Sequence, residues 1–149
     1  MDADESSFSP GETVIIYLAA AFEKYWAEAA RTYVTKGSSL DQVQSGSLNQ
    51  LYERRAKEMT PGKSASRFYR ETMAEMEKES FEYIPDYGLG QGIGLGIKER
   101  PLFTGEDDTL LDVGMFFSLR LLVKDKKLGA FMVGNTLRMT KKGAEILTV

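Results

Sequence analysis

The amino-acid sequence predicts an α+β domain in which two helices pack on one face of a curved, mainly antiparallel sheet. Two observations carry this prediction: strand-like and helix-like segments follow one another in blocks, and the composition changes sharply after Pro85. Before Pro85 the chain has one β-branched run and two segments with helical spacing. After it, the chain is rich in glycine and β-branched residues. Separate blocks of strands and helices are typical of α+β domains.

The segments before Pro85 are expected to form a strand, an ambiguous segment and two helices. Residues 13–19 have the β-branched run of a buried strand. Residues 22–34 contain alanines that favour a helix, and aromatic and β-branched residues that favour a long strand, so both structures remain open. Residues 39–59 and 64–79 place apolar side chains at helical spacing, and Pro61-Gly62 separates these two helices.

The segments after Pro85 are expected to form strands at 88–98, 113–123, 129–138 and 145–149. Glycines alternate at positions 88, 90, 92, 94 and 96, which leaves one face of an extended strand without side chains. Close packing of helices over that bare face is the favoured interpretation. A phosphate-binding loop is disfavoured, because such a loop turns into a helix and no Gly-Lys-Ser/Thr follows.

Composition bounds the class of protein. The 149 residues fit one domain, with residues 1–10 as a flexible lead and residues 11–149 as the folded part. The net charge is −3 and the basic residues are scattered, so no nucleic-acid-binding stripe is evident. The chain has no histidine and no cysteine, which excludes a thiolate nucleophile. The apolar stretch 14–22 is too short for a membrane span, and the acidic start lacks a signal-peptide pattern, so a soluble intracellular protein is expected.

Two short charged runs are expected to lie in solvated loops. Residues 105–108 read Gly-Glu-Asp-Asp, and residues 124–127 read Lys-Asp-Lys-Lys, which resembles the tip of a hairpin. Cationic peptides would favour acidic walls, and Glu28, Glu99 and residues 106–108 are the candidates for such walls.

Five stretches carry motifs in a fixed order: Gly11-Glu-Thr-Val-Ile-Ile-Tyr-Leu-Ala-Ala20, Tyr25-Trp-Ala-Glu-Ala-Ala-Arg-Thr-Tyr33, Thr60-Pro-Gly62, Gly90-Gln-Gly-Ile-Gly-Leu-Gly-Ile-Lys-Glu99, and Gly114-Met-Phe-Phe-Ser118 with Gly134-Asn-Thr-Leu137. In this order they resemble the pita-bread family of creatinase, X-Pro dipeptidase and methionine aminopeptidase. The resemblance covers residues 11–149 and implies a partial pita-bread domain.

Active members of that family hold two metal ions on two Asp, one His and two Glu. The resemblance places these ligands at Tyr17, Glu28, Gln91, Arg120 and Gly134, and places two assisting histidines at Tyr87 and Lys98. Of the five ligand positions, only Glu28 keeps an anion, and the positive charge of Arg120 would repel a divalent cation. The resemblance therefore implies a pocket without a metal, a cofactor or metallohydrolase activity. If Glu28, Arg120 and Lys98 meet there, a structural salt bridge is expected in place of the metals.

Within this family, the chain most resembles the peptidase-like amino-terminal domain of the large subunit of the FACT histone chaperone. That domain closes with Gly-Asp-Thr-Val where this chain has Gly134-Asn-Thr-Leu137, and it too lacks the catalytic Glu after Gly-Met-Val-Phe-Ser. The resemblance implies a noncatalytic, nuclear module that binds histones or basic peptides during nucleosome reorganisation in transcription and replication. It also implies another chaperone subunit as a partner.

Two alternatives stay open. The first is a pseudoenzyme of the dipeptidase family that acts as a peptide-binding or dimerisation scaffold. Uncovered sheet edges would let such a scaffold form homo- or hetero-oligomers. The second is an enzyme that uses a carboxylate, Lys, Tyr or Ser in place of histidine and cysteine.

Overall fold

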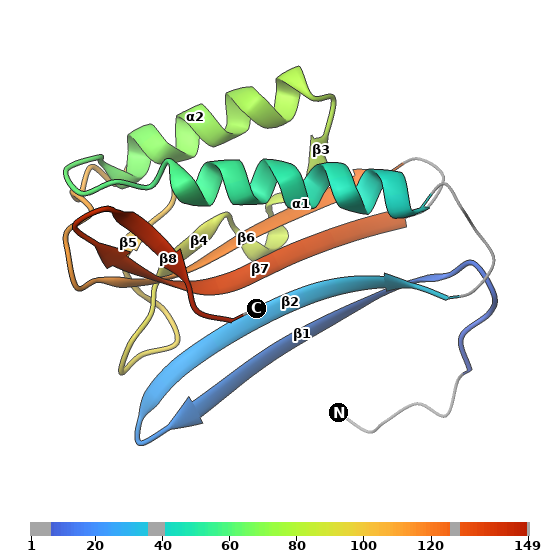
Figure 1. Cartoon of the computed structure of the whole chain (residues 1–149), viewed down its shortest axis with the longest axis horizontal. Helices are drawn as coiled ribbons and strands as arrows, with labels where there is room; N and C mark the ends of the chain where they lie inside the picture. The colour runs from blue at the N-terminus through green and yellow to red at the C-terminus, as the bar shows by residue number, and fades with distance from the viewer. Residues whose placement is uncertain (1–6, 36–40, 126–128, 149) are drawn as a thin grey trace.

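The structure is a computed structural model that describes residues 7–35, 41–125 and 129–148. Within these residues, two helices lie on one face of a single eight-stranded sheet (Figure 1). The elements in chain order are β1 (Thr13–Phe22), β2 (Tyr25–Val34), α1 (Asp41–Lys57), α2 (Ala65–Lys78), β3 (Glu82–Tyr83), the 3-10 helix η1 (Pro85–Tyr87), β4 (Gly90–Gly92), β5 (Glu99–Leu102), β6 (Phe116–Asp125), β7 (Gly129–Thr140) and β8 (Gly143–Ile146).

The sheet has the strand order β1-β2-β7-β6-β4-β5, while β3 pairs with β6 and β8 pairs with β7. Every described strand pair is antiparallel. Figure 1 shows α1 and α2 lying over β6 and β7, with the β1–β2 hairpin extending away from the helices. The predicted α+β class, with a curved antiparallel sheet and two helices on one face, is confirmed. None of the described helices is long and apolar enough to cross a membrane.

The ambiguous segment 22–34 forms the turn and second strand of a hairpin. Phe22 pairs with Tyr25, and the ten residues of β1 pair with the ten residues of β2 in one continuous register. The two turn residues, Glu23 and Lys24, have φ angles of 48° and 74°. Positive φ at both positions is the geometry of a type I′ turn. The sequence did not reveal this turn because its usual residues, Asn and Gly, are absent from it.

The prediction of one strand over residues 88–98 is wrong beyond Gly92. The prediction that helices pack over the face without side chains is wrong as well. Strand β4 covers Gly90–Gly92, residues 93–98 form a loop, and the unpredicted strand β5 follows. A Cβ on Gly90 would lie 2.1 Å from the carbonyl oxygen of Ser118, and one on Gly92 would lie 2.4 Å from that of Arg100. The glycines therefore make room for the backbones of the neighbouring strands, at a point where the β4–β5 register shifts.

The remaining elements follow the prediction with shifted ends. The strands expected at 113–123, 129–138 and 145–149 correspond to β6, β7 and β8. Some expected residues lie outside the described part of the chain: residues 1–6 of the lead, residues 39–40 of the first helix, residues 126–127 of the basic run and residue 149.

The acidic run 105–108 is a loop, but one of its carboxylates is buried. Asp107 is 8% exposed and accepts hydrogen bonds from the backbone amides of Leu102 at 2.8 Å and Thr109 at 3.0 Å. Hydrogen bonding from Thr109, followed by that from Leu102, holds the pKa of Asp107 below its ordinary value. Asp107 therefore fastens this loop to β5, which corrects the expectation of a fully solvated run.

The main hydrophobic core lies between the helices and the sheet. Leu51 of α1 and Phe68 of α2 are fully buried against Leu119 of β6 and the other residues of this cluster. The rings of Phe68, Phe103 and Phe117 stack in series, with centroid separations of 5.3 Å and 5.6 Å and tilted planes. Tilted rings at this spacing contribute beyond their buried area, so this column anchors α2 to the sheet.

A buried arginine ties the two helices together. Arg55 of α1 is 2% exposed, and its Nε donates to Thr72 Oγ1 of α2 at 3.0 Å. Its guanidinium forms ion pairs with Glu58 and with Glu71 and stands 5.1 Å from the ring centroid of Phe68. A buried charge needs such partners, because desolvation would otherwise disfavour it. This contact fixes how α1 lies against α2.

We expect Gly90→Ala to destabilise the fold, because Gly90 has a φ of 152° and a Cβ there would overlap the backbone of β6. Strain and overpacking together should lower the free energy of unfolding by about 3 kcal/mol or more. Gly46→Ala is the matched control, since a Cβ at this helical position meets nothing within 4 Å. It should raise stability by about 0.5–1 kcal/mol. Urea unfolding measures both, and equal midpoints would contradict the close approach of β4 and β6.

We expect Glu71→Gln to lower stability at pH 7 and to lose that effect in acid. Hydrogen bonding from Lys63 first, and then from Arg67, lowers the pKa of Glu71 from 4.5 to about 2. Because the pKa of Glu71 is lower in the folded state than in the unfolded state, the ionised carboxylate stabilises the fold. This contribution is fully present above pH 4.5 and disappears as the pH falls towards 2. The partly exposed ion pairs should be worth up to about 1 kcal/mol.

Urea unfolding of both proteins between pH 7 and pH 2 measures the difference. Glu77→Gln, which changes an exposed carboxylate on the same helix, is the control. A stability difference between wild type and Glu71→Gln that stays constant down to pH 2 would refute the assignment.

Candidate functional site

A buried ion pair lies on the face of the sheet opposite the helices. Glu28 of β2 is 3% exposed, Arg120 of β6 is 6% exposed, and Arg120 Nη1 lies 2.8 Å from Glu28 Oε2. Arg120 pairs in register with Gly134 of β7, which pairs with Ala30 of β2. Because side chains alternate between the two faces of a strand, Glu28 shares the face of Ala30 and therefore that of Arg120.

Three donors surround the Glu28 carboxylate. Tyr17 of β1 donates its hydroxyl to Oε1 at 2.6 Å, and Ser118 Oγ and Arg120 Nη1 both donate to Oε2. Burial first, and then hydrogen bonding to Glu28, raises the pKa of Tyr17 to about 12. Tyr17 is therefore a neutral donor at neutral pH, and both carboxylate oxygens of Glu28 are occupied.

Arg120 also bonds to two segments on the other side of the site. Its Nη2 donates to the backbone carbonyl of Tyr87 at 3.0 Å and to Gln91 Oε1. Gln91 in turn donates its amide to the carbonyl of Ile97 at 3.2 Å, at the end of the glycine-rich loop. Arg120 Nε is buried without an acceptor among the described residues. One guanidinium thus joins β2, β4 and η1.

Gly134 provides the space that the Arg120 side chain occupies. A Cβ at residue 134 would lie 3.0 Å from Arg120 Cγ and 3.2 Å from the Cβ of Ala30. Both approaches are closer than ordinary van der Waals contact. A larger residue at this point on β7 would displace the arginine, so the glycine and the arginine depend on each other.

The structure brings together most of the residues that the sequence singled out. The side chains of Tyr17, Glu28, Gln91 and Arg120 meet, Gly134 lines the same place, and Tyr87 takes part through its carbonyl while its side chain is exposed. Lys98 is exposed and lies outside this network. Of the three charges expected to meet, Glu28 and Arg120 do so and Lys98 does not.

Sequence analysis missed Ser118. Its hydroxyl is fully buried and donates to Glu28, and its place two residues before Arg120 on one strand puts it on the same face. This two-residue spacing from Arg120 is the sequence pattern from which Ser118 could have been predicted as part of the site. Glu28, expected as an acidic wall for a cationic peptide, is instead buried and paired with Arg120.

The residues at this site do not fit a divalent metal. No group of three or more His, Cys, Asp or Glu side chains in the described ranges is placed to hold one. Glu28 already accepts three hydrogen bonds, and the guanidinium beside it carries a fixed positive charge. The site is a closed network in which one negative and one positive side chain balance.

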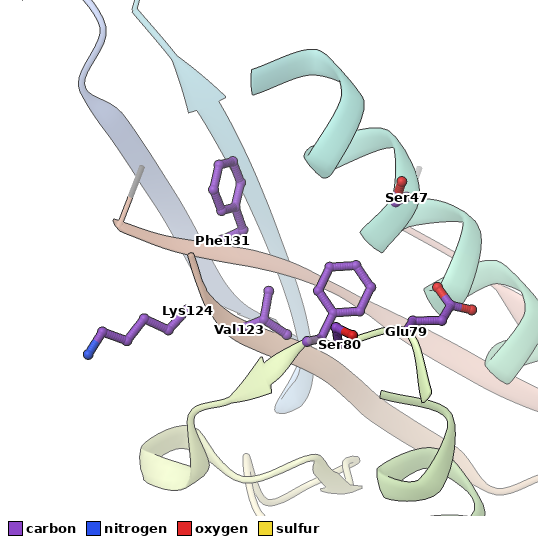
Figure 2. A pocket seen from close by; sticks show the side chains of 7 residues that line it. Ser47, Glu79, Ser80, Val123, Lys124 and Phe131 are labelled. Carbon is purple, nitrogen blue, oxygen red and sulfur yellow. The ribbon is translucent and has the colours of Figure 1, made fainter. Parts of the chain in front are cut away.

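A separate cavity of about 250 Å³ opens on the helix side of the sheet (Figure 2). It lies between α1, the turn from α2 to β3, and the ends of β6 and β7, and its lining residues are Ser47, Glu79, Ser80, Phe81, Val123, Lys124 and Phe131. Glu79 forms an ion pair with Arg54, and Figure 2 shows Lys124 at the rim, pointing away from the other side chains. Among the described lining residues, the acidic Glu79 and the basic Lys124 therefore do not face each other across the cavity.

The sequence profile of metallopeptidase family M24 matches residues 2–141. This chain belongs to metallopeptidase family M24. The Xaa-Pro dipeptidase of Pyrococcus furiosus is 28% identical over 98% of this chain and 42% of its own length. The FACT complex subunit SPT16 of Zea mays is 23% identical over 95% of this chain and 14% of its own length. The chain therefore spans well under half the length of these curated relatives.

Solved structures of M24 proteins share the fold. The prolidase from Pyrococcus furiosus superposes with a TM-score of 0.87 at 25% identity, over 99% of this chain and 44% of the prolidase. The amino-terminal domain of SPT16 from Cicer arietinum superposes with a TM-score of 0.78 at 19% identity, over all of this chain and 40% of that domain. The resemblance to the pita-bread fold is thereby confirmed. At 19% sequence identity, the similarity to the SPT16 domain establishes a shared fold and no shared function.

We expect Arg120→Ala to destabilise this M24 domain strongly, because it leaves the Glu28 carboxylate buried without a countercharge. Breaking a buried pair from one side costs about 3–5 kcal/mol. Arg138→Ala is the matched control, since Arg138 forms a half-exposed pair with Glu145 and its loss should cost less than about 1 kcal/mol. Urea unfolding of the two variants distinguishes them, and similar losses for both would show that the Arg120 pair is not a structural requirement.

We expect the effects of Gly134→Ala and Arg120→Ala to be non-additive. Gly134→Ala alone should cost about 1–3 kcal/mol, because the new methyl group collides with the arginine stem. In the Arg120→Ala background the collision with Arg120 Cγ is removed while the 3.2 Å approach to the Cβ of Ala30 remains, so part of this cost should vanish. A double-mutant cycle by urea unfolding measures the coupling. Strictly additive losses would mean that the two positions do not share space.

Proposed function

We propose that this chain is a noncatalytic, peptidase-like domain that binds a protein partner, with histones or histone-tail peptides as that partner. The observation that carries the proposal is the closed Glu28–Arg120 network at the centre of the sheet face. By resemblance, this is where M24 enzymes hold their metals. A guanidinium stands here in the place of divalent cations.

The proposal that the domain is noncatalytic is supported by the state of each group in the site. Hydrolysis of a peptide needs an activated nucleophile or water, and therefore a base or a metal. Glu28 is ion-paired with Arg120 and accepts three hydrogen bonds, from Tyr17, Ser118 and Arg120, so its carboxylate is held by groups of the chain itself. Tyr17, with a pKa of about 12, stays protonated at neutral pH. Tyr17 is therefore not prepared to act as a base, and Glu28 is engaged with Arg120.

The histone partner is supported by the SPT16 relatives, which match nearly the whole chain. A histone-chaperone domain of this kind would act in the nucleus, in nucleosome reorganisation and together with another chaperone subunit. The net charge of −3 suits a cationic partner, although Glu28 no longer contributes to the surface. Of the expected acidic walls, Glu99, Glu106 and Asp108 are exposed and remain for such contacts.

A second candidate function is a peptide-binding or dimerisation scaffold of dipeptidase ancestry. It is supported by the 28% identity to the Xaa-Pro dipeptidase, which exceeds the 23% identity to SPT16. This candidate shares the absence of catalysis with the first and differs in the partner.

We expect this domain to bind histone H3–H4 saturably and more tightly than a basic polypeptide without tryptophan, such as polylysine. The fluorescence of Trp26, the single tryptophan, provides the signal. Each titration is repeated across salt concentrations up to 150 mM, where the Debye length is about 8 Å. Binding that vanishes with salt, or that is equally tight for polylysine, would contradict the histone proposal and favour the second candidate.

A peptidase assay tests the absence of catalysis separately. With X-Pro and Met-X dipeptides and added Mn²⁺ or Co²⁺, the protein should show no turnover above a metal-only blank. Turnover that is abolished by a chelator and by Glu28→Gln would overturn the noncatalytic assignment, whatever the histone titration shows.

A further inference from the structure

A cavity of about 320 Å³ opens beside the glycine-rich loop 93–98, between that loop, the start of β2 and the start of β6. Two backbone hydrogen bonds bring these segments together. The amide of Trp26 donates to the carbonyl of Gly94 at 2.8 Å, and the amide of Ile93 donates to the carbonyl of Phe116 at 3.0 Å. Figure 1 shows the loop between β4 and β5 reaching towards the turn of the β1–β2 hairpin. No side chain of the ion-pair network described above lines this cavity.

The walls of this cavity carry large apolar side chains that are open to solvent. Tyr25 of β2, Leu95 of the loop and Phe116 of β6 all line it, and each is at least 42% exposed. The face of an aromatic ring attracts a cation, and an aliphatic stem can lie along apolar walls while its charged end stays in water. The walls therefore suit a long side chain that has an apolar stem and a positive end.

Glu99 supplies a negative charge to this cavity and is the one acid among its described lining residues. Its Oε1 accepts a hydrogen bond from the backbone amide of Gly96, whereas no described residue donates a hydrogen bond to its Oε2. A Cβ at Gly94 would lie 3.2 Å from Oε2, and one at Gly96 would lie 3.2 Å from Oε1. The two glycines thus allow the loop to fold over the carboxylate. One oxygen of this exposed side chain is left to accept a bond from a ligand.

The positive charges near this cavity do not balance Glu99. Arg100 also lines the cavity, but its Nη1 lies 3.9 Å from Oδ2 of Asp107, which is outside the lining. Lys98 is exposed and does not line the cavity. Within the part of the chain that the structure describes, Glu99 therefore forms no ion pair, so its charge can attract a cation from a partner.

We propose that this cavity binds a lysine side chain of a partner polypeptide, with the ammonium group at Glu99 and the aliphatic stem against Tyr25 and Phe116. The proposal deepens the proposed function and rests on its basic partner, since a histone or a histone-tail peptide would supply the lysine. Lysine is favoured over arginine because a compact ammonium group needs only one carboxylate oxygen, whereas a guanidinium is matched to two.

An NMR titration of the isotope-labelled chain tests the site with a probe much smaller than a histone. The probe is a capped Gly-Lys-Gly tripeptide. The comparison tripeptide carries norleucine in place of lysine, which keeps the stem and removes the charge. The lysine peptide should shift the amide signals of Gly94, Gly96 and Trp26 saturably, and the norleucine peptide should bind about fivefold more weakly or worse. Equal affinities, or shifts confined to other parts of the chain, overturn the proposal.

Two matched variants test the role of Glu99. Glu99→Gln removes the charge and keeps an oxygen that can accept the bond from Gly96, so the loop should be retained. This variant should bind the lysine peptide about fivefold more weakly than wild type. Glu106→Gln is the control, because it removes an exposed carboxylate that does not line the cavity, and it should bind like wild type. Equal affinities of the two variants exclude Glu99 as the counterion.

A third variant tests the aromatic wall on a side chain that the fold leaves exposed. Tyr25→Leu keeps an apolar surface and removes the ring, so it should weaken the lysine peptide more than the norleucine peptide. An equal effect on both peptides would contradict a contact between the ammonium group and this ring.

Histone titration of Glu99→Gln separates this proposal from the proposed function. Weaker binding of H3–H4 than by wild type supports both. If the variant binds H3–H4 as tightly as wild type, the histone proposal stands and this cavity is excluded as the histone contact. If wild type binds the lysine peptide at this cavity and does not bind H3–H4, the histone partner is overturned and the lysine site stands.

Discussion

Glu28 and Arg120 lie on strands that are separated by β7, and their buried side chains meet over Gly134. Neither charge is tolerable there alone, so each requires the other. The other contacts of the site are made to this pair. Tyr17 and Ser118 donate hydrogen bonds to the Glu28 carboxylate, and Gln91 and the Tyr87 carbonyl accept hydrogen bonds from the Arg120 guanidinium. The pair therefore connects the edge hairpin, the centre of the sheet and the segment before β4.

The same pair balances the charge at a site where the described residues of this M24 chain bring together no group of three or more His, Cys, Asp or Glu side chains. In metallopeptidases, cations hold acidic side chains from several strands together, and their removal would leave those charges in mutual repulsion. Here a single guanidinium, that of Arg120, supplies the positive charge from within the chain. Because residue 134 is glycine, there is space for the Arg120 side chain beside β7. One negative and one positive side chain thus balance on this face of the sheet.

The two faces of the sheet have different roles. On one face, α1 and α2 cover an apolar core, and the buried Arg55 holds the two helices in place. On the other face, the ion-pair network occupies the centre. The β1–β2 hairpin lies away from both helices (Figure 1), and β1 carries exposed apolar side chains such as Leu18 and Phe22.

The sequence by itself determined the fold class, both helices, the strands β1, β6, β7 and β8, and most residues of the site. It did so because hydrophobic periodicity and motif order are local properties of the chain. Tertiary structure decided the rest: the two-residue turn at Glu23 and Lys24, the break of the glycine-rich segment after Gly92, the place of Ser118 and the exclusion of Lys98. These features depend on which backbone approaches which strand and on which charges share a buried space. Residues distant in the sequence set those distances, so no local pattern records them.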